Sequence, residues 1–177
     1  MIFKATTLAG VFVLELERHE DERGFFGRTW DPDELRAHGL DATIAQASVS
    51  FNRRRGTLRG LHYQAAPFEE AKLVRVTRGA VFDVVVDARP GSPTRGKHVA
   101  MTLSAEEGNQ IYIPPGCAHG FQTLADATEL SYLISARYSP EHARGFRFDD
   151  PTLAIPWPEP VTVISERDRA LPPFPVK

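Results

Sequence analysis

Two histidines of this 177-residue chain lie near groups that could assist proton chemistry. His62 is followed by Glu69, Glu70 and Lys72, and His119 lies further along, in a segment rich in glycine and proline. Histidine titrates near neutral pH and can act as a general base, while a lysine ammonium stabilises negative charge that develops on an oxygen. A single histidine is more often a hydrogen-bonded structural residue, but two of them with a lysine and a carboxylate favour a functional site.

A metal site is the first alternative reading of these residues. Residues 60–64 (GLHYQ) and 108–121 (GNQIYIPPGCAHGF) resemble the two sequence motifs of the cupins, a jelly-roll superfamily. A metal-binding cupin has histidines at i and i+2, which point to the same side of a strand. Here Gln64 takes the second position, and Lys72 would place an ammonium near the ion. His62, Gln64, His119 and a glutamate could still bind iron or manganese, but ligand softness and charge disfavour it, so we predict neither metal nor cofactor.

The elements that must position these residues are mainly short β-strands. Residues 11–17 alternate between two faces, and residues 72–77 and 81–87 are rich in β-branched side chains. The residues between these last two runs, Arg78-Gly79-Ala80, predict a hairpin. Further strands are predicted at residues 98–103, 110–113, 120–124 and 128–135. Many short strands separated by glycine and proline predict an all-β fold, a closed or double-sheet antiparallel barrel.

One helix and a proline-rich tail complete the expected organisation. Asp31 can cap a helix, Pro32 suits its first position, and Gly39 ends it. The tail after Pro151 is too short for a second domain, so we expect it to pack on the barrel as an extended strap. Residues 1–177 are therefore predicted to form a single domain.

Composition restricts the partners and the compartment. The net charge of −2 disfavours a sequence-independent hold on nucleic acid or on an anionic membrane. The N-terminus becomes acidic too soon for a secretory signal, and no apolar run approaches the length of a membrane span. Cys117 is the one cysteine, which favours a reducing compartment. We therefore predict a cytoplasmic protein without nucleic-acid or membrane partners.

Several segments, taken in order along the chain, form a specific set. They are residues 21–26, 58–64, 72–76, 81–84 with Asp87, 113–121, Tyr132, 138–140, 149–151, 157–158 and 165–168. Each segment alone is a weak signal, but together they resemble the dTDP-4-dehydrorhamnose 3,5-epimerases over nearly the whole chain. The resemblance implies a cupin-type antiparallel jelly-roll barrel with one or a few short helices. It also implies an isomerase that epimerises a nucleotide-linked 4-keto-6-deoxy sugar at C3 and C5 without metal.

Epimerisation beside a ketone needs a base, a group that holds the enolate oxygen, and an acid on the opposite face. The resemblance implies that His62 is the base and that Asp168 fixes its tautomer. It implies that Lys72 donates to the C4 oxygen and that Tyr132 is the acid. Considered alone, Tyr132 would be a core tyrosine and Asp168 a surface charge. Asp83, a second carboxylate on a strand, could orient a histidine instead.

The resemblance also implies a nucleotide-binding surface and a homodimer, in which strands could be exchanged between sheets. Guanidinium groups suit a diphosphate because they bind it with two hydrogen bonds. The basic run at residues 53–55 is expected to be a solvated turn rather than a ligand site. The implied substrate-binding residues are Arg23 and Arg59 at the diphosphate, Tyr138 stacked on the base, and Gln46, Lys72, His119 and Arg167 as further contacts.

Two departures from the family pattern leave the substrate open. Arg28 stands where the family usually has glutamate, and Ala47-Ser48 follows Gln46 where the family has Asp-Asn. Both departures fall on the binding side and spare His62 and Lys72. A single-carbon epimerase of a dTDP-, CDP- or GDP-linked keto sugar is the alternative within enzymes. A non-catalytic sugar-binding cupin and a metal-dependent cupin oxygenase are the alternatives from other classes.

Overall fold

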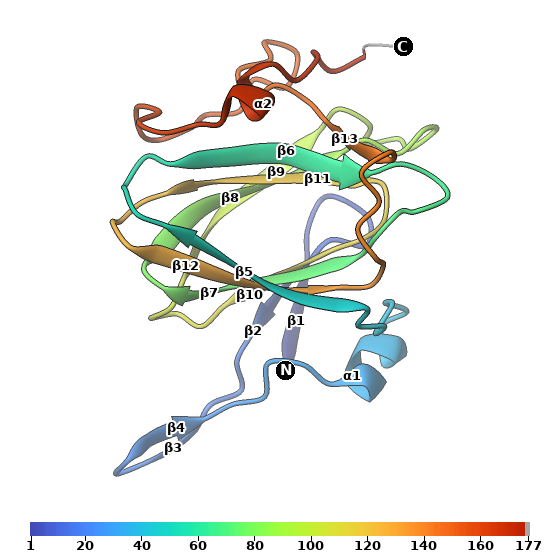
Figure 1. Cartoon of the computed structure of the whole chain (residues 1–177). Helices are drawn as coiled ribbons and strands as arrows, with labels where there is room; N and C mark the ends of the chain where they lie inside the picture. Colours follow the sequence, from blue (N-terminus) through green and yellow to red (C-terminus); the bar gives the residue numbers. More distant parts are fainter. Residues whose placement is uncertain (176–177) are drawn as a thin grey trace.

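Two antiparallel β-sheets face each other in the computed structural model, which describes residues 1–175 (Figure 1). The last two residues of the predicted domain, Val176 and Lys177, lie outside the described residues. One sheet has six strands in the order β1-β2-β10-β7-β12-β5. Its strands are β1 (Ile2–Ala5), β2 (Phe12–Glu15), β5 (Gln46–Asn52), β7 (Lys72–Arg78), β10 (Gln110–Ile113) and β12 (Thr128–Ile134).

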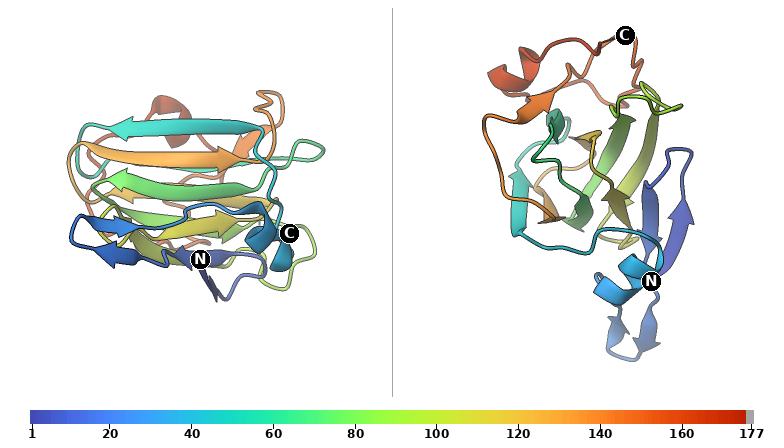
Figure 2. Two further views of the ribbon diagram at one scale, coloured as in Figure 1. Left: turned by 90° about the horizontal axis from the view of Figure 1, so that it is seen from below. Right: turned by 90° about the vertical axis from the view of Figure 1, so that its right-hand side faces the viewer.

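The second sheet has five strands in the order β13-β6-β11-β8-β9. Its strands are β6 (Leu58–Gln64), β8 (Ala80–Asp87), β9 (His98–Ser104), β11 (Cys117–Thr123) and β13 (Ala143–Gly145). A separate two-stranded arm, β3 (His19–Asp21) with β4 (Gly24–Phe26), projects from the side of the six-stranded sheet (Figures 1 and 2). The predicted all-β, cupin-type antiparallel barrel is therefore confirmed.

The space between the sheets is filled by side chains that alternate with outward-facing ones along each strand. On β7, Val74 and Val76 are buried in this core, whereas Arg75 lies on the opposite face. Burial of each large apolar side chain contributes about 1.5–3 kcal/mol, so this cluster holds the two sheets together. The core cluster consists of Leu8, Val11, Val74, Val76, Val81, Val85, Leu103, Ile111, Ile113, Cys117, Phe121 and Leu130.

The proline-rich tail covers the outer face of the five-stranded sheet, on the side opposite the arm (Figure 2). Leu153 and Phe174 of the tail pack in one cluster with Leu61 of β6 and Val84 of β8. The indole nitrogen of Trp157 donates to a backbone carbonyl at 2.8 Å. The predicted strap on the barrel is therefore confirmed, and it brings residues near the C-terminus beside β6.

Two short helices flank the barrel. Helix α1 (Pro32–Ala37) begins as predicted, with the Asp31 side chain accepting two backbone N–H groups of the first turn. Helix α2 (Glu166–Arg169) lies in the tail and is capped by the Ser165 side chain. Neither of these helices of residues 1–175 is long and apolar enough to cross a membrane.

The predicted hairpin at Arg78-Gly79-Ala80 is wrong. Strand β7 pairs with β10 and β12, whereas β8 pairs with β9 and β11 in the other sheet. The chain therefore crosses from one sheet to the other at this point. Gly79 has a φ of +78°, and a Cβ there would lie 2.5 Å from the Thr128 hydroxyl, so the crossing needs glycine.

Candidate active site

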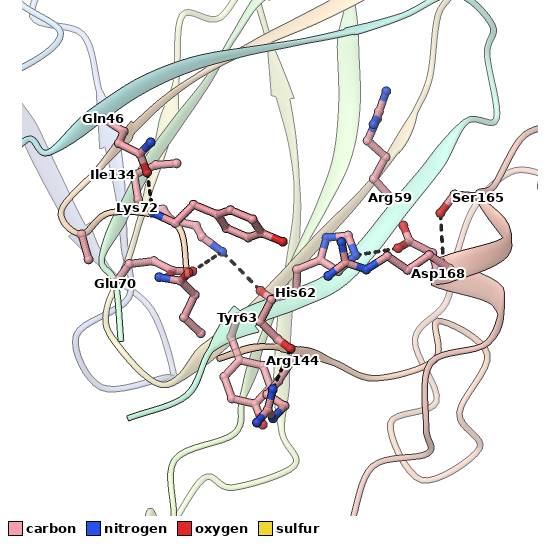
Figure 3. A pocket seen from close by; sticks show the side chains of 15 residues that line it. Gln46, Arg59, His62, Tyr63, Glu70, Lys72, Ile134, Arg144, Ser165 and Asp168 are labelled. Atoms are coloured by element: carbon pink, nitrogen blue, oxygen red, sulfur yellow. Dashed lines mark hydrogen bonds and ion pairs between the residues drawn. The ribbon is translucent and has the colours of Figure 1, made fainter. Parts of the chain in front are cut away.

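A cavity of about 350 Å³ lies against β6, β7, β13, helix α2 and the loop that follows β12 (Figure 3). This volume is in the range of small-molecule sites. Three of the predicted catalytic residues line the cavity, namely His62, Lys72 and Asp168. Besides Lys72, which was also predicted to bind substrate, four predicted binding residues line it, namely Gln46, Arg59, Tyr138 and Arg167. The structure thus brings together residues from both ends of the chain.

A bulge in β6 allows Arg59 and His62 to face the same cavity. The two residues are three positions apart on β6 but pair with residues only two positions apart on β11. Without this extra residue, strict alternation would point their side chains to opposite sides of the sheet. Gly60 lies in the bulge, and a Cβ there would be 2.6 Å from the Gly120 Cα. Glycine is therefore required for β6 and β11 to approach this closely.

His62 and Asp168 form a hydrogen-bonded pair, with 2.7 Å between Nε2 and Oδ1 (Figure 3). The other carboxylate oxygen of Asp168 accepts the backbone N–H of Gly60 at 3.1 Å. Burial alone would raise the pKa of Asp168, but the hydrogen bond and charge of His62 and the Gly60 N–H lower it below its ordinary value. Asp168 is therefore ionised near neutral pH, and Nε2 of His62 carries the shared hydrogen. Nδ1 is then the nitrogen that can accept a proton from a substrate.

The Lys72 ammonium is held in place by two oxygens. Glu70 Oε1 lies 3.0 Å from Lys72 Nζ, and the His62 carbonyl oxygen accepts from the same Nζ at 3.3 Å (Figure 3). An ammonium has three N–H donors, so one remains for a ligand in the cavity. Glu70 is in the segment that the sequence singled out, but its role as the partner of Lys72 was not predicted.

Tyr132 and His119 are not among the residues that line the cavity. Tyr132 comes from β12 of the six-stranded sheet and packs against the core cluster. Its ring meets the ring of His119 edge to face, with 6.1 Å between centroids. The Tyr132 hydroxyl makes no hydrogen bond to another residue within 1–175. Burial, and secondarily the charge of Asp83, raise the pKa of Tyr132 well above its ordinary value, so the phenol stays protonated.

Asp83 orients a histidine, but the histidine is His119 rather than His62. Asp83 Oδ2 lies 2.8 Å from His119 Nε2, and both side chains are buried. The preference for Asp168 over Asp83 as the partner of His62 agrees with the distances. His119 was predicted to contact the substrate, but it does not line the cavity; its Nε2 is occupied by Asp83, and its ring lies beside Tyr132.

Cations and one aromatic side chain surround the mouth of the cavity. Arg59 is oriented by its Nε, which donates to the Asn52 side chain at 2.8 Å, and its terminal nitrogens remain available. Arg167 is exposed on α2, beside the buried Asp168. Tyr138 is 56% exposed and offers a ring face for stacking. These groups suit an anionic, aromatic ligand such as a nucleotide.

Arg23 does not reach this cavity. It lies at the tip of the arm, its side chain is 85% exposed, and it forms an ion pair with Asp21 at 2.5 Å. Arg28, at a position where the sequence departs from the family pattern, pairs with Asp31 at 3.1 Å near the start of α1. Arg23 and Arg28, which occupy positions expected on the nucleotide-binding side, therefore both lie outside the cavity of their own chain.

Two further lining residues, Tyr63 and Arg144, were not predicted. They pair directly across β6 and β13, and Tyr63 stacks on Phe146. No local signal marks them, because β13 is only three residues long. Gln64, weighed above as a metal ligand, uses its side chain for hydrogen bonds to the backbone. Within residues 1–175, no group of three or more His, Cys, Asp or Glu side chains is placed to share an ion.

Comparisons of this chain with a family model, with curated proteins and with solved structures all point to the same family. A family model described as dTDP-4-dehydrorhamnose 3,5-epimerase matches residues 5–175. A curated protein of that name from Sinorhizobium fredii is 44% identical over 173 residues, which are 97% of this chain and 89% of the relative. The Bacillus anthracis enzyme with TDP and PPi bound is 37% identical with a TM-score of 0.94, and the match covers 97% of this chain and 98% of that one. The Legionella pneumophila enzyme in complex with dTDP-4-keto-L-rhamnose is 37% identical with a TM-score of 0.91, covering 98% and 92%.

Proposed function

Because the chain belongs to the dTDP-4-dehydrorhamnose 3,5-epimerase family, we propose that it converts dTDP-4-dehydro-6-deoxy-D-glucose to dTDP-4-dehydro-L-rhamnose. The reaction inverts C3 and C5, which both flank the C4 ketone. Each inversion removes a proton from one face of the sugar and returns one to the other face. The ketone acidifies both carbons, so the chain's own side chains suffice for the proton transfers proposed here.

The observation that carries this proposal is the placement of a base and an acid on facing sheets. His62 is on β6 of the five-stranded sheet, and Tyr132 is on β12 of the six-stranded sheet. Because the two sheets face each other, the two side chains approach the space between the sheets from opposite sides. A binding protein would have no use for an acid opposite a base.

The proposed steps follow from the contacts of each side chain. Nδ1 of His62 takes the proton from C3 or C5, because Nε2 is occupied by Asp168. Asp168 stabilises the imidazolium that forms. The remaining N–H of Lys72 donates to the C4 oxygen as it becomes an enolate, where a fixed ammonium is most effective. Tyr132 then gives its proton to carbon on the opposite face.

The nucleotide end of the substrate is proposed to lie at the cavity mouth. Arg59 and Arg167 are available to the diphosphate, and Tyr138 offers a stacking face to the base. Gln46 also lines the cavity, and its amide nitrogen, which has no hydrogen-bond partner within residues 1–175, is available for a further contact. These residues supply binding that does not change during the reaction.

The test is incubation with dTDP-4-keto-6-deoxy-glucose in deuterated water, followed by NMR of the sugar. Deuterium at both C3 and C5 with inversion supports the proposal. Deuterium at one carbon only would identify a single-carbon epimerase, and turnover of CDP- or GDP-linked keto sugars alone would reassign the nucleotide. Binding without any exchange would identify a non-catalytic sugar-binding protein.

We also propose a homodimer in which the arm of one copy serves the cavity of the other. Arg23 lies outside its own cavity, and the arm exposes Phe25 and Phe26, the latter by 71%. The amide nitrogen of Gln110 is buried without a partner within residues 1–175, next to a groove on the outer face of the six-stranded sheet. A second copy on this face would cover the apolar arm and complete the site.

Mixing two impaired variants tests this arrangement. A mixed dimer of Arg23→Ala and His62→Ala would contain one intact site if the arm serves the partner's cavity. If Arg23 served its own cavity, every site in the mixed dimer would stay defective. Because loss of Arg23 should weaken substrate binding, activity is measured at substrate concentrations well below the KM of Arg23→Ala. We expect co-refolded variants to exceed the activity of either variant alone under these conditions, and absence of any gain would contradict the proposal.

A cytoplasmic location completes the proposal. It is supported by the single cysteine, Cys117, whose thiol is buried in the core with its pKa raised to about 11 by burial. Such a thiol needs no oxidising compartment. Fractionation of the producing cells, with the protein detected by antibody, tests this location directly.

A further inference from the structure

The loop that carries Tyr138 is held by one glutamine from each sheet. Gln46 on β5 accepts the backbone N–H of Tyr138 at 2.7 Å. Gln64 on β6 accepts the backbone N–H of Ser139 at 2.6 Å. Two successive amide groups are thus fixed by side chains from opposite walls of the cavity, one of which, Gln46, is labelled in Figure 3. The loop spans the mouth where the proposed function puts the nucleotide.

Gln64 uses both ends of its amide. While its oxygen accepts from Ser139, its nitrogen donates to the Phe68 carbonyl at 2.8 Å and to the Arg137 carbonyl at 3.2 Å. Gln64 is only 5% exposed, so these bonds are sheltered from water. The side chain therefore ties the loop after β6 to the loop that presents Tyr138.

The requirement for two donors and one acceptor selects an amide at this position. A carboxylate would place negative charge against two carbonyl oxygens, and an imidazole would lack one of the donors. Leaving a buried carbonyl or N–H without a partner is costly, so the clamp resists replacement by either group. This is the position where a metal-binding cupin has its second histidine, and here the side chain is turned to the backbone instead.

We propose that Gln64 is a positioning residue for nucleotide recognition, which acts by fixing the Tyr138 ring at the cavity mouth. The inference rests on the proposed function, because it assigns Tyr138 to the nucleotide base. Gln64 makes no side-chain hydrogen bond to His62, Lys72 or Asp168. Its loss should therefore weaken nucleotide binding while the proton transfers continue.

The chain offers a matched control for the variant Gln64→Leu. Gln122 is equally buried and clamps the backbone in the same way: its nitrogen donates to the Glu159 carbonyl at 2.8 Å and its oxygen accepts the Glu159 N–H at 3.0 Å. This clamp holds the tail, away from Tyr138. Gln122→Leu thus removes a comparable clamp without touching the Tyr138 loop.

The experiment measures the Kd of dTDP by calorimetry, with kcat and KM for the dTDP-linked keto sugar and the melting temperature of each variant. We expect Gln64→Leu to weaken dTDP binding and raise KM by roughly tenfold to a hundredfold, the value of one base–aromatic stack, with kcat nearly unchanged. Gln122→Leu should lower the melting temperature to a similar degree and leave dTDP binding unchanged.

A double-mutant cycle with Tyr138→Ala decides whether Gln64 acts through the ring. In the Tyr138→Ala background, Gln64→Leu should weaken dTDP binding little further. An undiminished effect of Gln64→Leu in that background, an equal loss of dTDP binding in Gln122→Leu, or a fall in kcat at unchanged KM would each overturn the proposal. Failure of the intact protein to bind dTDP would refute the proposed function itself and this inference with it, whereas the other outcomes refute this inference alone.

Discussion

Replacing Tyr132 by phenylalanine should separate proton removal from inversion. The hydroxyl makes no hydrogen bond to another residue within 1–175, so its removal leaves no protein group unpaired. The ring contacts with His119 and the core cluster remain. We therefore expect the free energy of unfolding to change by less than about 1 kcal/mol. Any large kinetic effect then reports chemistry rather than loss of the fold.

The size of the kinetic effect follows from the role of the missing proton. A general acid contributes roughly 10²–10⁴-fold, so inversion at C3 and C5 should slow by about that factor. His62, Asp168 and Lys72 keep their contacts, so proton abstraction should continue. The side chain of His62 is 41% exposed, so its captured proton can exchange with solvent and return as deuterium to the original face. The variant should therefore exchange without inverting.

The assay is NMR of deuterium content and configuration at C3 and C5 after incubation of the substrate in deuterated water. Tyr112→Phe is the control, because Tyr112 is a buried tyrosine of the six-stranded sheet whose hydroxyl bonds the backbone of Asp41. That change should cost stability and leave exchange and inversion unaltered. His62→Ala should abolish exchange at both carbons.

Two results would refute this reasoning. If Tyr132→Phe lost exchange and inversion equally, Tyr132 would not act after the enolate. If His62→Ala kept undiminished exchange, another base would be required, and Asp83 or His119 would be the candidates. These two residues are hydrogen-bonded to each other and do not line the cavity, which is why we do not expect that outcome.

Three further predictions test other parts of the site and the fold. Exhaustive chelation should leave the rate unchanged, because Lys72 is proposed to stabilise the enolate; activity that is lost and then restored by added metal would contradict this. Arg59→Ala should raise KM more than it lowers kcat, because the diphosphate contact is the same in ground and transition states, and a normal KM with a collapsed kcat would reverse the assignment. Burial opposes a low pKa for Asp87, but hydrogen bonds from Arg89 and Ser92 outweigh it, so the native pKa lies below the unfolded value of 3.8. The contribution of ionised Asp87 to stability is thus present above pH 3.8 and is lost as the pH falls through the native pKa. Denaturant titrations should therefore show that the free energy of unfolding falls less steeply with acid in Asp87→Asn than in the intact protein. An equal fall in both proteins would show that Asp87 does not cause the loss of stability in acid.

Local pattern predicted strands well where one face is buried in the core. The strand predicted at residues 128–135 is β12 (Thr128–Ile134), and residues 110–113 are β10. The local sequence pattern could not predict how the chain runs from one strand to the next, because a glycine such as Gly79 suits a tight turn and a crossing between sheets equally. The chain crosses between the sheets at Gly79 because β7 pairs with β10 and β12, which are distant from it in sequence. Strand β5 was missed because its larger apolar residues, Val49 and Phe51, are on the exposed face.

Some residues of the site could likewise be identified from the sequence around them, whereas others depend on contacts between distant parts of the chain. His62 and Lys72 could be identified from their spacing in the sequence, on strands that follow one another along the chain. Asp168 could not, because it lies 106 residues from its partner in sequence and in a helix of four charged residues that looks like a solvated surface. Only the family resemblance pointed to it. The resemblance also suggested Arg23, but a sequence cannot say whether a residue serves its own cavity or that of a second copy.

The sandwich of two sheets explains why one base and one acid could serve two carbons. Lys72 belongs to the same sheet as Tyr132, yet its ammonium donates to the carbonyl of His62 on the opposite sheet, so it links the two sheets that carry the proposed base and acid. An oxygen at C4 held by this ammonium would put C3 and C5, which both adjoin C4, at comparable distances from His62 on one side and Tyr132 on the other. The separation of the sheets, about 10 Å, then fixes proton removal and proton return to opposite faces of the ring. In the proposed mechanism, inversion rather than simple exchange thus follows from which sheet each side chain comes from.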